Sequence, residues 1–250
     1  MRSAAALVVE QDQEQPLYAK NTGVPMPIAS ITKLMTAMLV LDAQLPFDEP
    51  ITISKEDVDT LRGTRSKLQV GLTLTRQELL QLALMASENR AAAALARTYP
   101  GGVPAFVAAM NRKAKALGMM DTQFVDSTGL NSANVSTAQD LVKMVKASYG
   151  YELIREYTTA PSYAVALRKS RYLPFHNSNR LVKSKSWDIG LSKTGYIRDS
   201  GRCLVMQVRI AEQKLIIVLL DSWGKYTRIA DANRIKRWIE TGLTHKPHSS

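Results

Sequence analysis

Apolar residues follow two different periods along this chain. Short runs rich in β-branched and other apolar residues predict β-strands near the two ends, at residues 4–9, 17–19, 203–210 and 214–220. In residues 28–44, which lack Gly and Pro, apolar side chains instead recur three and four positions apart, which predicts a buried helix. Both ends of the chain therefore favour extended structure, and the middle favours helices.

Local start and stop signals divide the rest of the chain into further helices. The signals are capping boxes, a Pro in the first turn and a Gly after the last turn. In chain order they predict a helix opened by Thr75 and Glu78 that runs to residue 86, one from Pro104 to Gly118, one opened by Ser136 and Gln139, and one over 228–240. The last two strands are joined by the short connection 211–213.

Strands at both ends that enclose a helical middle predict an α+β fold. We expect one antiparallel sheet built from the two termini, with a helical subdomain inserted into it. A chain of 250 residues can bury one sizeable core, so we expect a single domain over 1–250. Its sheet subdomain would comprise 1–29 and about 150–243, its helical subdomain about 30–149, and 244–250 would be a frayed tail.

Composition excludes several classes of protein. No apolar run reaches the roughly 18 residues that a membrane span needs. The single cysteine, Cys203, cannot form an internal disulfide, and three scattered histidines with one cysteine give no metal-ligand spacing. We therefore expect neither a metal nor a cofactor. Residues 4–9 run directly into Glu10 and Asp12, which does not fit a signal peptide, so the chain is either cytoplasmic or already processed.

The net charge of +11 is concentrated in the second half of the chain. No acidic residue occurs between Glu156 and Asp188, whereas six basic residues fall within 168–185. The few aromatic residues among them form no nucleic-acid motif, so we predict a solvated hairpin surface and no nucleic-acid partner. The basic residues are Arg168, Lys169, Arg171, Arg180, Lys183 and Lys185.

A first candidate for chemistry is the S-x-x-K pattern of Ser30 and Lys33. On a helix these positions lie about 5–6 Å apart between Cβ atoms, so the amine can take the proton of the hydroxyl. Such a base needs its pKa lowered from ~10.4 to near 7, at a cost of roughly 4–5 kcal/mol. A plain helix cap explains Ser30 equally well, and Ser222 with Lys225 repeats the pattern after a strand, where a turn is expected.

A second candidate is the S-x-N pattern of Ser87 and Asn89, at the junction of two predicted helices. A hydroxyl and an amide that project together there can relay a proton and hold a substrate carbonyl. An interhelical cap is the alternative interpretation. Ser132 and Asn134 form another copy of the pattern, so it is weak alone.

A third candidate is the tripeptide Lys193-Thr194-Gly195, which occurs once and precedes the C-terminal strands. Lys193 would bring a second positive charge near Lys33, and Thr194 would offer a hydroxyl to a substrate carboxylate. Gly195 would let an extended peptide approach the backbone of an edge strand. An exposed strand with a solvated lysine is the alternative.

Together and in this order, the three patterns form a specific constellation. From about residue 4 to 242 the chain resembles the low-molecular-mass penicillin-binding proteins, which are serine D-alanyl-D-alanine peptidases. Further stretches resemble their D-alanyl-D-alanine endopeptidase subgroup, penicillin-binding proteins 7 and 8, and Glu88 stands where carboxypeptidase relatives usually carry Gly. These stretches are residues 26–29, 87–92, 99–102, 127–130, 134–137 and 191–195.

The resemblance implies the fold of penicillin-recognising serine transferases and β-lactamases, and a role for each site residue. Ser30 would attack, Lys33 would act as its base, and Ser87 would relay the proton to the leaving amine. The substrate would be held by Asn89, Lys193, Thr194, Gly195 and Tyr196, and the N–H groups of Ser30 and Tyr196 would form the oxyanion hole.

The resemblance also implies the partners: peptidoglycan peptides as substrates and β-lactams as covalent inhibitors. No E-x-x-L-N segment is present, so we expect β-lactams to acylate Ser30 and stay bound. We expect a periplasmic protein whose signal peptide was removed, with peripheral association with the membrane or wall. Three interpretations stay open: an endopeptidase of cross-links, a carboxypeptidase that releases terminal D-alanine, and a non-catalytic module that binds cell wall.

Overall fold

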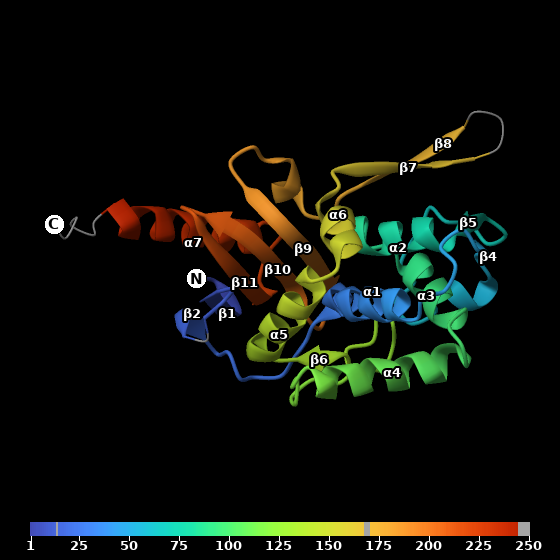
Figure 1. Ribbon diagram of the computed structural model, residues 1–250, viewed down its shortest axis with the longest axis horizontal. Helices are drawn as coiled ribbons and strands as arrows, with labels where there is room; N and C mark the ends of the chain where they lie inside the picture. The colour runs from blue at the N-terminus through green and yellow to red at the C-terminus, as the bar shows by residue number, and fades with distance from the viewer. Residues whose placement is uncertain (14, 168–170, 245–250) are drawn as a thin grey trace.

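A five-stranded antiparallel sheet built from both ends of the chain forms one half of the molecule. The computed structural model describes residues 1–13, 15–167 and 171–244. The strand order is β2-β1-β11-β10-β9, and each neighbouring pair is antiparallel (Figure 1). The strands are β1 (Ser3–Glu10), β2 (Pro16–Lys20), β9 (Asp188–Ile197), β10 (Gly201–Ile210) and β11 (Gln213–Ser222). The predicted α+β class and the sheet from both termini are confirmed.

The central strands are buried on both faces, which explains their unbroken apolar runs. Alternate side chains of β1, β10 and β11 point into two different hydrophobic clusters, one against the helical part and one against α7 (Thr227–Thr244). A sheet covered on both sides needs apolar residues at successive positions rather than at every second one. Figure 1 shows α7 along the face that is turned away from the other helices.

The tight turn between β10 and β11 is shorter than the sequence predicts. Gln213 already pairs with Ile210, which leaves a two-residue connection of Ala211 and Glu212. Both residues have positive φ, 47° and 67°, as a hairpin turn that matches the twist of the strands requires.

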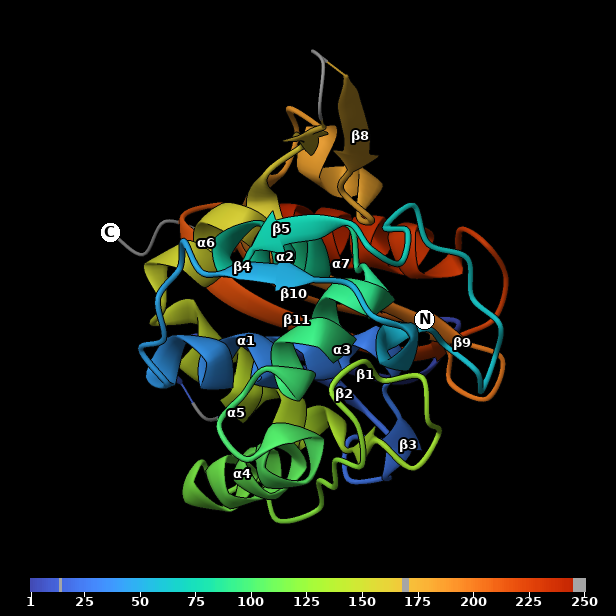
Figure 2. The same ribbon diagram turned by 90° about the vertical axis from the view of Figure 1, so that its right-hand side faces the viewer.

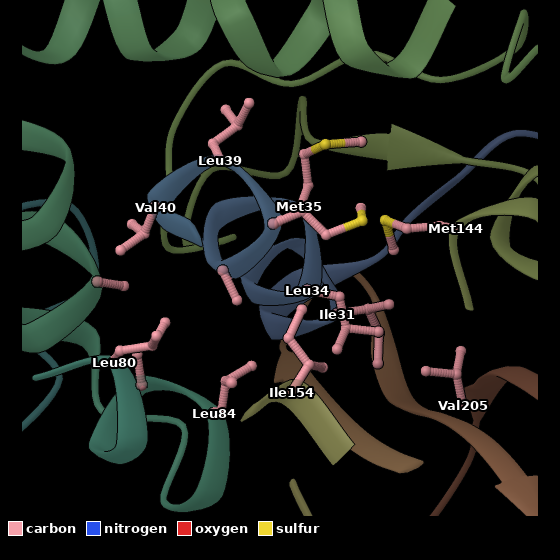
Figure 3. Packing of buried hydrophobic residues seen from close by; sticks show 14 of the residues in the cluster. Ile31, Leu34, Met35, Leu39, Val40, Leu80, Leu84, Met144, Ile154 and Val205 are labelled. Atoms are coloured by element: carbon pink, nitrogen blue, oxygen red, sulfur yellow. The ribbon is translucent and has the colours of Figure 1, made fainter. Parts of the chain in front are cut away.

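The helical half packs around α1 (Lys33–Asp42), which is buried from Lys33 to Val40. Figure 3 shows side chains of this segment, including Ile31, Leu34 and Met35, surrounded by apolar residues of α2, α5, α6 and β10. Burial on every side fixes both the position and the rotation of the segment that carries Ser30 and Lys33. The helical elements are η1 (Ala29–Thr32), α1 (Lys33–Asp42), η2 (Lys55–Asp57), α2 (Arg76–Met85), α3 (Asn89–Arg97), α4 (Gly102–Ala116), α5 (Ala138–Tyr149), α6 (Glu152–Thr159) and η3 (Arg180–Lys183).

Helix caps agree with the sequence at α2 and differ at α5. Thr75 and Glu78 form the predicted reciprocal capping box of α2. At α5 the cap is Thr137, whose hydroxyl accepts from the backbone N–H of Asp140 at 3.2 Å, rather than the predicted Ser136. Ser136 is buried and pairs with Thr122 instead. The predicted start of α5 is therefore one residue too early. Ser136 and Thr137 each stand three residues before a side chain that suits a capping box, Gln139 and Asp140, so the sequence does not separate them.

Short strand pairs complete the structure. Sheet pairs form between β3 (Met26–Pro27) and β6 (Val135–Ser136), between β4 (Pro50–Thr52) and β5 (Thr73–Thr75), and between β7 (Ser162–Ala166) and β8 (Tyr172–His176). The β7–β8 hairpin projects from the body of the molecule (Figures 1 and 2). Arg168 and Lys169 of the basic stretch, and residues 245–250 of the predicted tail, lie outside the described residues. The predicted division into two subdomains stays a prediction.

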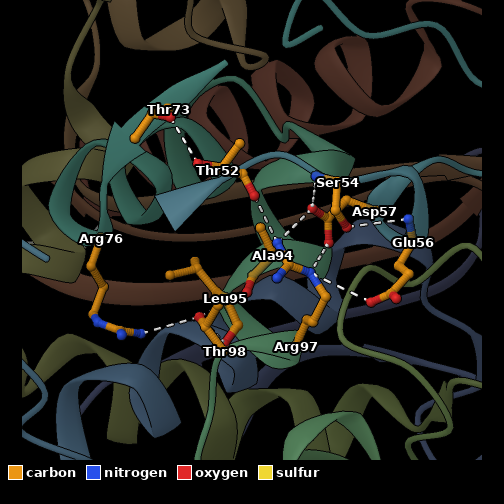
Figure 4. Close-up of polar contacts among 10 residues, drawn as sticks. All are labelled: Thr52, Ser54, Glu56, Asp57, Thr73, Arg76, Ala94, Leu95, Arg97 and Thr98. Carbon is orange, nitrogen blue, oxygen red and sulfur yellow. Dashed lines mark hydrogen bonds and ion pairs between the residues drawn. The ribbon is translucent and has the colours of Figure 1, made fainter. Parts of the chain in front are cut away.

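An ion-pair network fixes the segment before β5 to α3. Arg97 donates two hydrogen bonds of 2.9 Å to the buried carboxylate of Asp57, whose backbone belongs to a capped turn (Figure 4). Two parallel hydrogen bonds to one carboxylate restrict geometry more than a single contact does. Asp57 raises the pKa of Arg97 through the side-chain hydrogen bond, against the effect of burial.

Among the described helices, none is long and apolar enough to cross a membrane.

Candidate active site

The three sequence patterns meet where the sheet and the helical half adjoin. The Nζ atom of Lys33 lies 2.8 Å from Ser30 Oγ and 2.7 Å from Asn89 Oδ1. The Nζ atom of Lys193 lies 2.8 Å from Ser87 Oγ. Ser30 comes from η1 and Lys33 from the first position of α1. Ser87 and Asn89 come from the junction of α2 and α3, and Lys193 comes from the edge strand β9.

The other copies of these patterns lie elsewhere in the structure. Ser222 ends β11, where its Oγ lies 2.7 Å from Ser3 Oγ in a buried contact. Asn134 belongs to a loop and accepts hydrogen bonds from the backbone N–H groups of Val125 and Asp126. The tertiary structure therefore separates the site from repeats that the sequence alone left equivalent.

Ser30 lies in a 3₁₀ turn rather than at the start of the α-helix that the sequence predicts. The α-helix begins only at Lys33. Ala29, the residue before Ser30, has a φ of +47°. A non-glycine residue in the left-handed region is strained, so surrounding contacts must hold it there. Ala29 is fully buried, which supplies those contacts.

Two glycines pack directly against the peptide that joins Ala29 to Ser30. A Cβ atom added to Gly129 would lie 1.9 Å from the carbonyl oxygen of Ala29. One added to Gly195 would lie 2.7 Å from the carbonyl oxygen of Ile28 and 3.2 Å from the nitrogen of Ser30. Gly129 also has a φ of +81°. Only glycine fits at either position. The N–H of Ser30 is therefore held close to the backbone of β9, where Tyr196 follows Gly195.

Lys33 is fully buried, and its amine has three oxygen atoms within hydrogen-bond distance. Besides Ser30 Oγ, they are the carbonyl oxygens of Asn89 and of the Thr128 backbone, each 2.7 Å away. Carbonyl oxygens only accept hydrogen bonds, so a neutral amine donates its two N–H groups to them and directs its lone pair to the hydroxyl. Burial lowers the pKa of Lys33 from 10.5 to about 7, and the carboxylates of Asp126 and Glu88 oppose this shift.

The carboxylate of Asp126 shapes the loop that supplies the Thr128 carbonyl. It accepts hydrogen bonds from the backbone N–H groups of Thr128 and Gly129, both at 2.6 Å, and from that of Asn131 at 2.9 Å. The side chain of Asn134 adds a further bond of 2.8 Å. Sequence analysis assigned no role to Asp126. An Asp two and three residues before Thr and Gly is the available signal, because it is typical of a turn closed by its own carboxylate.

Ser87 and Lys193 form a second buried contact beside the first. Ser87 has a φ of +60°, which places its side chain at the break between α2 and α3. Lys193 donates to Ser87 Oγ and to the Thr194 carbonyl oxygen, at 2.8 and 3.0 Å. Its pKa is held well below 10.5 by burial first, then by the positive charges of Lys33 and Arg228. We predicted that burial and a neighbouring positive charge, that of Lys193, would together lower the pKa of Lys33. Burial is the first cause for both lysines, and Lys193 is not among the causes of the Lys33 shift.

The end of β9 presents the remaining predicted residues. Thr194 is buried, and its hydroxyl donates to Ser178 Oγ at 2.7 Å. Tyr196 is 55% exposed, and the guanidinium of Arg202 lies 4.4 Å from the centre of its ring. Because β9 is the last strand in the sheet, one of its edges is free to pair with an extended peptide.

Arg228 is a further cation at this strand that sequence analysis did not identify. It lies in α7, which follows the last strand of the sheet in the chain. Its guanidinium donates to the carbonyl oxygens of Gly195 and Cys203 at 3.0 and 3.1 Å. Burial and the charge of Arg202 lower its pKa from 12.5 to about 10. No local pattern marks it, since the residues it contacts are distant in sequence.

The loop between η2 and β5 forms one rim of the site. The hydroxyl of Thr64 accepts from Asn89 Nδ2 at 3.1 Å, and Ser66 donates to the carboxylate of Glu88. The unusual middle residue of the second pattern, Glu88, therefore anchors this loop.

In the described part of the chain, no three His, Cys, Asp or Glu side chains are grouped so that they could hold a metal ion.

Comparison with known proteins identifies similar chains of known name. A D-alanyl-D-alanine endopeptidase of Pseudomonas aeruginosa is 49% identical over 97% of this chain and 78% of its own length. One of Escherichia coli with the same name is 46% identical over 96% of this chain and 78% of its own length.

Solved structures agree with this result. The DD-transpeptidase of Streptomyces K15 matches with a TM-score of 0.86 and 27% identity, over 95% of this chain and 97% of that one. Penicillin-binding protein D2 of Listeria monocytogenes, in its cefotaxime-bound form, matches with a TM-score of 0.82 and 28% identity, over 95% and 96% of the two chains. Residues 1–224 match the family described as D-alanyl-D-alanine carboxypeptidase, and the chain belongs to that family.

Proposed function

We propose that this protein is a serine D-alanyl-D-alanine endopeptidase that cleaves peptide cross-links of bacterial peptidoglycan through an acyl-enzyme. The observation that carries the proposal is the buried amine of Lys33, which has two carbonyl oxygens for its N–H groups and the Ser30 hydroxyl for its lone pair. The names of the relatives from Pseudomonas aeruginosa and Escherichia coli support the endopeptidase reaction.

In the first step, Ser30 Oγ attacks the carbonyl carbon of the D-alanine whose peptide bond is cut. Lys33 Nζ takes the hydroxyl proton as the C–O bond forms. The negative charge on the carbonyl oxygen is stabilised by the N–H groups of Ser30 and Tyr196. The packing of Gly129 and Gly195 against the peptide before Ser30 supports this assignment, because it keeps the two N–H groups in a fixed relation.

The leaving amine must gain a proton when the C–N bond breaks. Ser87 is the group that we assign to this transfer: it passes its hydroxyl proton to the amine and regains one from Lys33. The 2.8 Å contact with Lys193 holds the Ser87 hydroxyl in place. Water then attacks the carbonyl carbon of the ester, and Lys33 takes a proton from it. Lys33 returns this proton to Ser30 Oγ as the bond between Oγ and the acyl group breaks.

The substrate would lie along the free edge of β9. Asn89 would hold its amide, Thr194 would bind the carboxylate of the leaving residue, and Lys193 would add positive charge. Residues Gly195 and Tyr196 would contribute backbone contacts. The buried position of Lys193 beside Thr194 supports an anionic group at this end of the site.

β-Lactams would act as covalent inhibitors that acylate Ser30 and remain there. The cefotaxime-bound form of the Listeria monocytogenes relative supports this proposal. We further propose a periplasmic location, after removal of a signal peptide, with peripheral association with wall or membrane. Release of terminal D-alanine is the second candidate function, favoured by the description of the family that residues 1–224 match. Among the residues that the structure describes, no observation favours a non-catalytic wall-binding module.

Digestion of purified muropeptides tests the proposed reaction. The parent protein is expected to convert a cross-linked dimer into monomers, while Ser30→Ala is expected to lose at least about 1,000-fold in rate, since it removes the nucleophile. Products are read by mass spectrometry. Release of only terminal D-alanine would assign the carboxypeptidase reaction instead, and cleavage by the Ser30→Ala variant at the parent rate would refute the role of Ser30.

The pH dependence of acylation tests the role of Lys33. Because its pKa is lowered to about 7, the neutral amine predominates above pH 7 and the protonated amine below it. The second-order rate of acylation by a fluorescent penicillin is therefore expected to fall about tenfold per pH unit below 7 and to level off above it. A profile that is flat from pH 5 to 8, or that rises only near pH 10, would contradict a neutral base.

Substitution of Gly129 tests the placement of the Ser30 N–H. Gly129→Ala would force the peptide before Ser30 to move, and a fall of about 100-fold in the acylation rate per folded molecule is expected. Gly71→Ala is the matched control, because Gly71 also has a positive φ, +90°, but open space around its Cβ position. The control is expected to lose about 1 kcal/mol of stability and keep its rate within about twofold. Equal rates in both variants would contradict the account.

A further inference from the structure

A small cavity lined by cations opens next to β9, the strand that carries Lys193, Thr194 and Gly195 and that we call the K-T-G strand. Its volume is about 100 Å³, and its lining contains four basic side chains and no carboxylate. Uncompensated positive charge around a cavity favours an anionic ligand. The residues that line it are Ser178, Arg180, Arg202, Lys225, Tyr226, Arg228 and Ile229.

Three of these cations, which we call the cation cluster, are Arg180, Arg202 and Lys225. Throughout residues 1–13, 15–167 and 171–244, none of the ion pairs includes a member of the cluster. Their close contacts are aromatic: Arg180 and Lys225 lie 5.6 and 5.5 Å from the ring centre of Tyr226. The charge of Lys225 first, and then Arg180, lowers the pKa of the Tyr226 hydroxyl. The cluster thus concentrates positive charge without a partner carboxylate.

The cavity is connected to the proposed active site by direct contacts. Ser178, in its lining, accepts the hydrogen bond of the Thr194 hydroxyl at 2.7 Å. Arg202 pairs with Tyr196 in the register of β9 and β10, and its guanidinium stacks on the Tyr196 ring. A ligand that places one carboxylate at Thr194 and continues past Ser178 would therefore reach the cation cluster.

The two candidate reactions differ in what leaves the enzyme at this end. Release of terminal D-alanine expels one amino acid with one carboxylate, which Thr194 would hold. Cleavage of a cross-link expels a whole peptide, which carries further carboxylates beyond the one next to the cut bond. A second anion site beside Thr194 thus has a ligand only in the cross-link reaction.

We infer that the cation cluster binds a second carboxylate of the leaving peptide and thereby favours cleavage of cross-links over release of terminal D-alanine. The inference rests on the proposed function and names the residues that select its substrate. Arg228 is set apart from the cluster because it contacts the carbonyl oxygen of Gly195 in the K-T-G strand. Arg180 and Lys225 are exposed, and within the described residues no hydrogen bond joins either of them to that strand, so they can be changed without altering it.

The test compares two double variants with the same change in charge. Arg180→Gln with Lys225→Gln removes two charges of the cluster. The matched control, Lys115→Gln with Lys214→Gln, removes two exposed charges from α4 and from the opposite end of β11. For each protein, kcat/KM is measured on a cross-linked dimer and on a pentapeptide monomer, together with the acylation rate by a fluorescent penicillin.

The cluster variant is expected to lose about tenfold in kcat/KM on the dimer, as the loss of charge-assisted contacts predicts, and less than about twofold on the monomer and the penicillin. The control is expected to keep all three rates within about twofold. A dimer whose leaving-strand carboxylates are amidated should be cleaved at similar, reduced rates by the parent and the cluster variant, because the group that the cluster recognises is then absent.

Several outcomes would overturn the inference, and they differ from a failure of the proposed function. If the parent cleaves the dimer and the cluster variant cleaves it equally fast, the cluster does not bind the leaving peptide. An equal loss on dimer, monomer and penicillin would show damage to the site instead of lost selectivity. If the control variant loses as much on the dimer as the cluster variant, general attraction between a basic protein and an anionic substrate explains the effect. A parent that does not cleave the dimer at all refutes the proposed function and the inference together.

Discussion

The burial of the Lys33 amine is the constraint on which the rest of the site depends. An ammonium group loses its hydration when it is taken out of water, and this cost is what brings the pKa down to about 7. The shift is useful only if the amine stays in one place, so that its lone pair faces Ser30. The two carbonyl acceptors at 2.7 Å provide that orientation, one from the side chain of Asn89 and one from the backbone of Thr128.

Much of the surrounding structure can be understood as support for those two acceptors. Asp126 closes the loop that presents the Thr128 carbonyl, and its charge also limits how far the Lys33 pKa falls. Thr64 accepts a hydrogen bond from the side-chain amide of Asn89. Residues 33–40 of α1 are buried. Apolar side chains pack around this segment (Figure 3), which keeps the backbone of Lys33 in one position. A buried polar group is stable only where its partners are complete, and here η1, α3 and the loop each contribute one partner of the Lys33 amine.

A second buried lysine extends the same principle across the site. Lys193 and Lys33 are both out of water, and the charge of Lys33 helps to lower the pKa of Lys193. From the buried lysines, positive charge continues through Arg228 to the cation cluster, whose cavity Arg228 also lines. The site therefore passes from two buried lysines, whose pKa values burial lowers, to the exposed side chains of Arg180 and Lys225, where we infer that an anionic part of the substrate binds.

The parts of this arrangement that local patterns encode were predictable from the sequence. The strands at both ends, the capping box of Thr75 and the order of the three motifs each leave a signal within a few residues. The left-handed backbone at Ala29 left no such signal, because contacts with distant glycines impose it. Arg228 was missed for the same reason, since its partners lie in strands far from it along the chain. Sequence patterns identified which residues meet, but the burial that sets their pKa values belongs to the tertiary structure.

The central claim, that burial makes Lys33 a neutral base near pH 7, is tested most directly by the titration of that side chain. Lysine labelled with ¹³C at Cε allows each amine to be followed by NMR from pH 5 to 11, and Lys33→Arg assigns the signal. The account predicts a Lys33 titration with a midpoint near pH 7, well below the value of about 10.4 for a lysine side chain in water. A Lys33 midpoint at that ordinary value would contradict it.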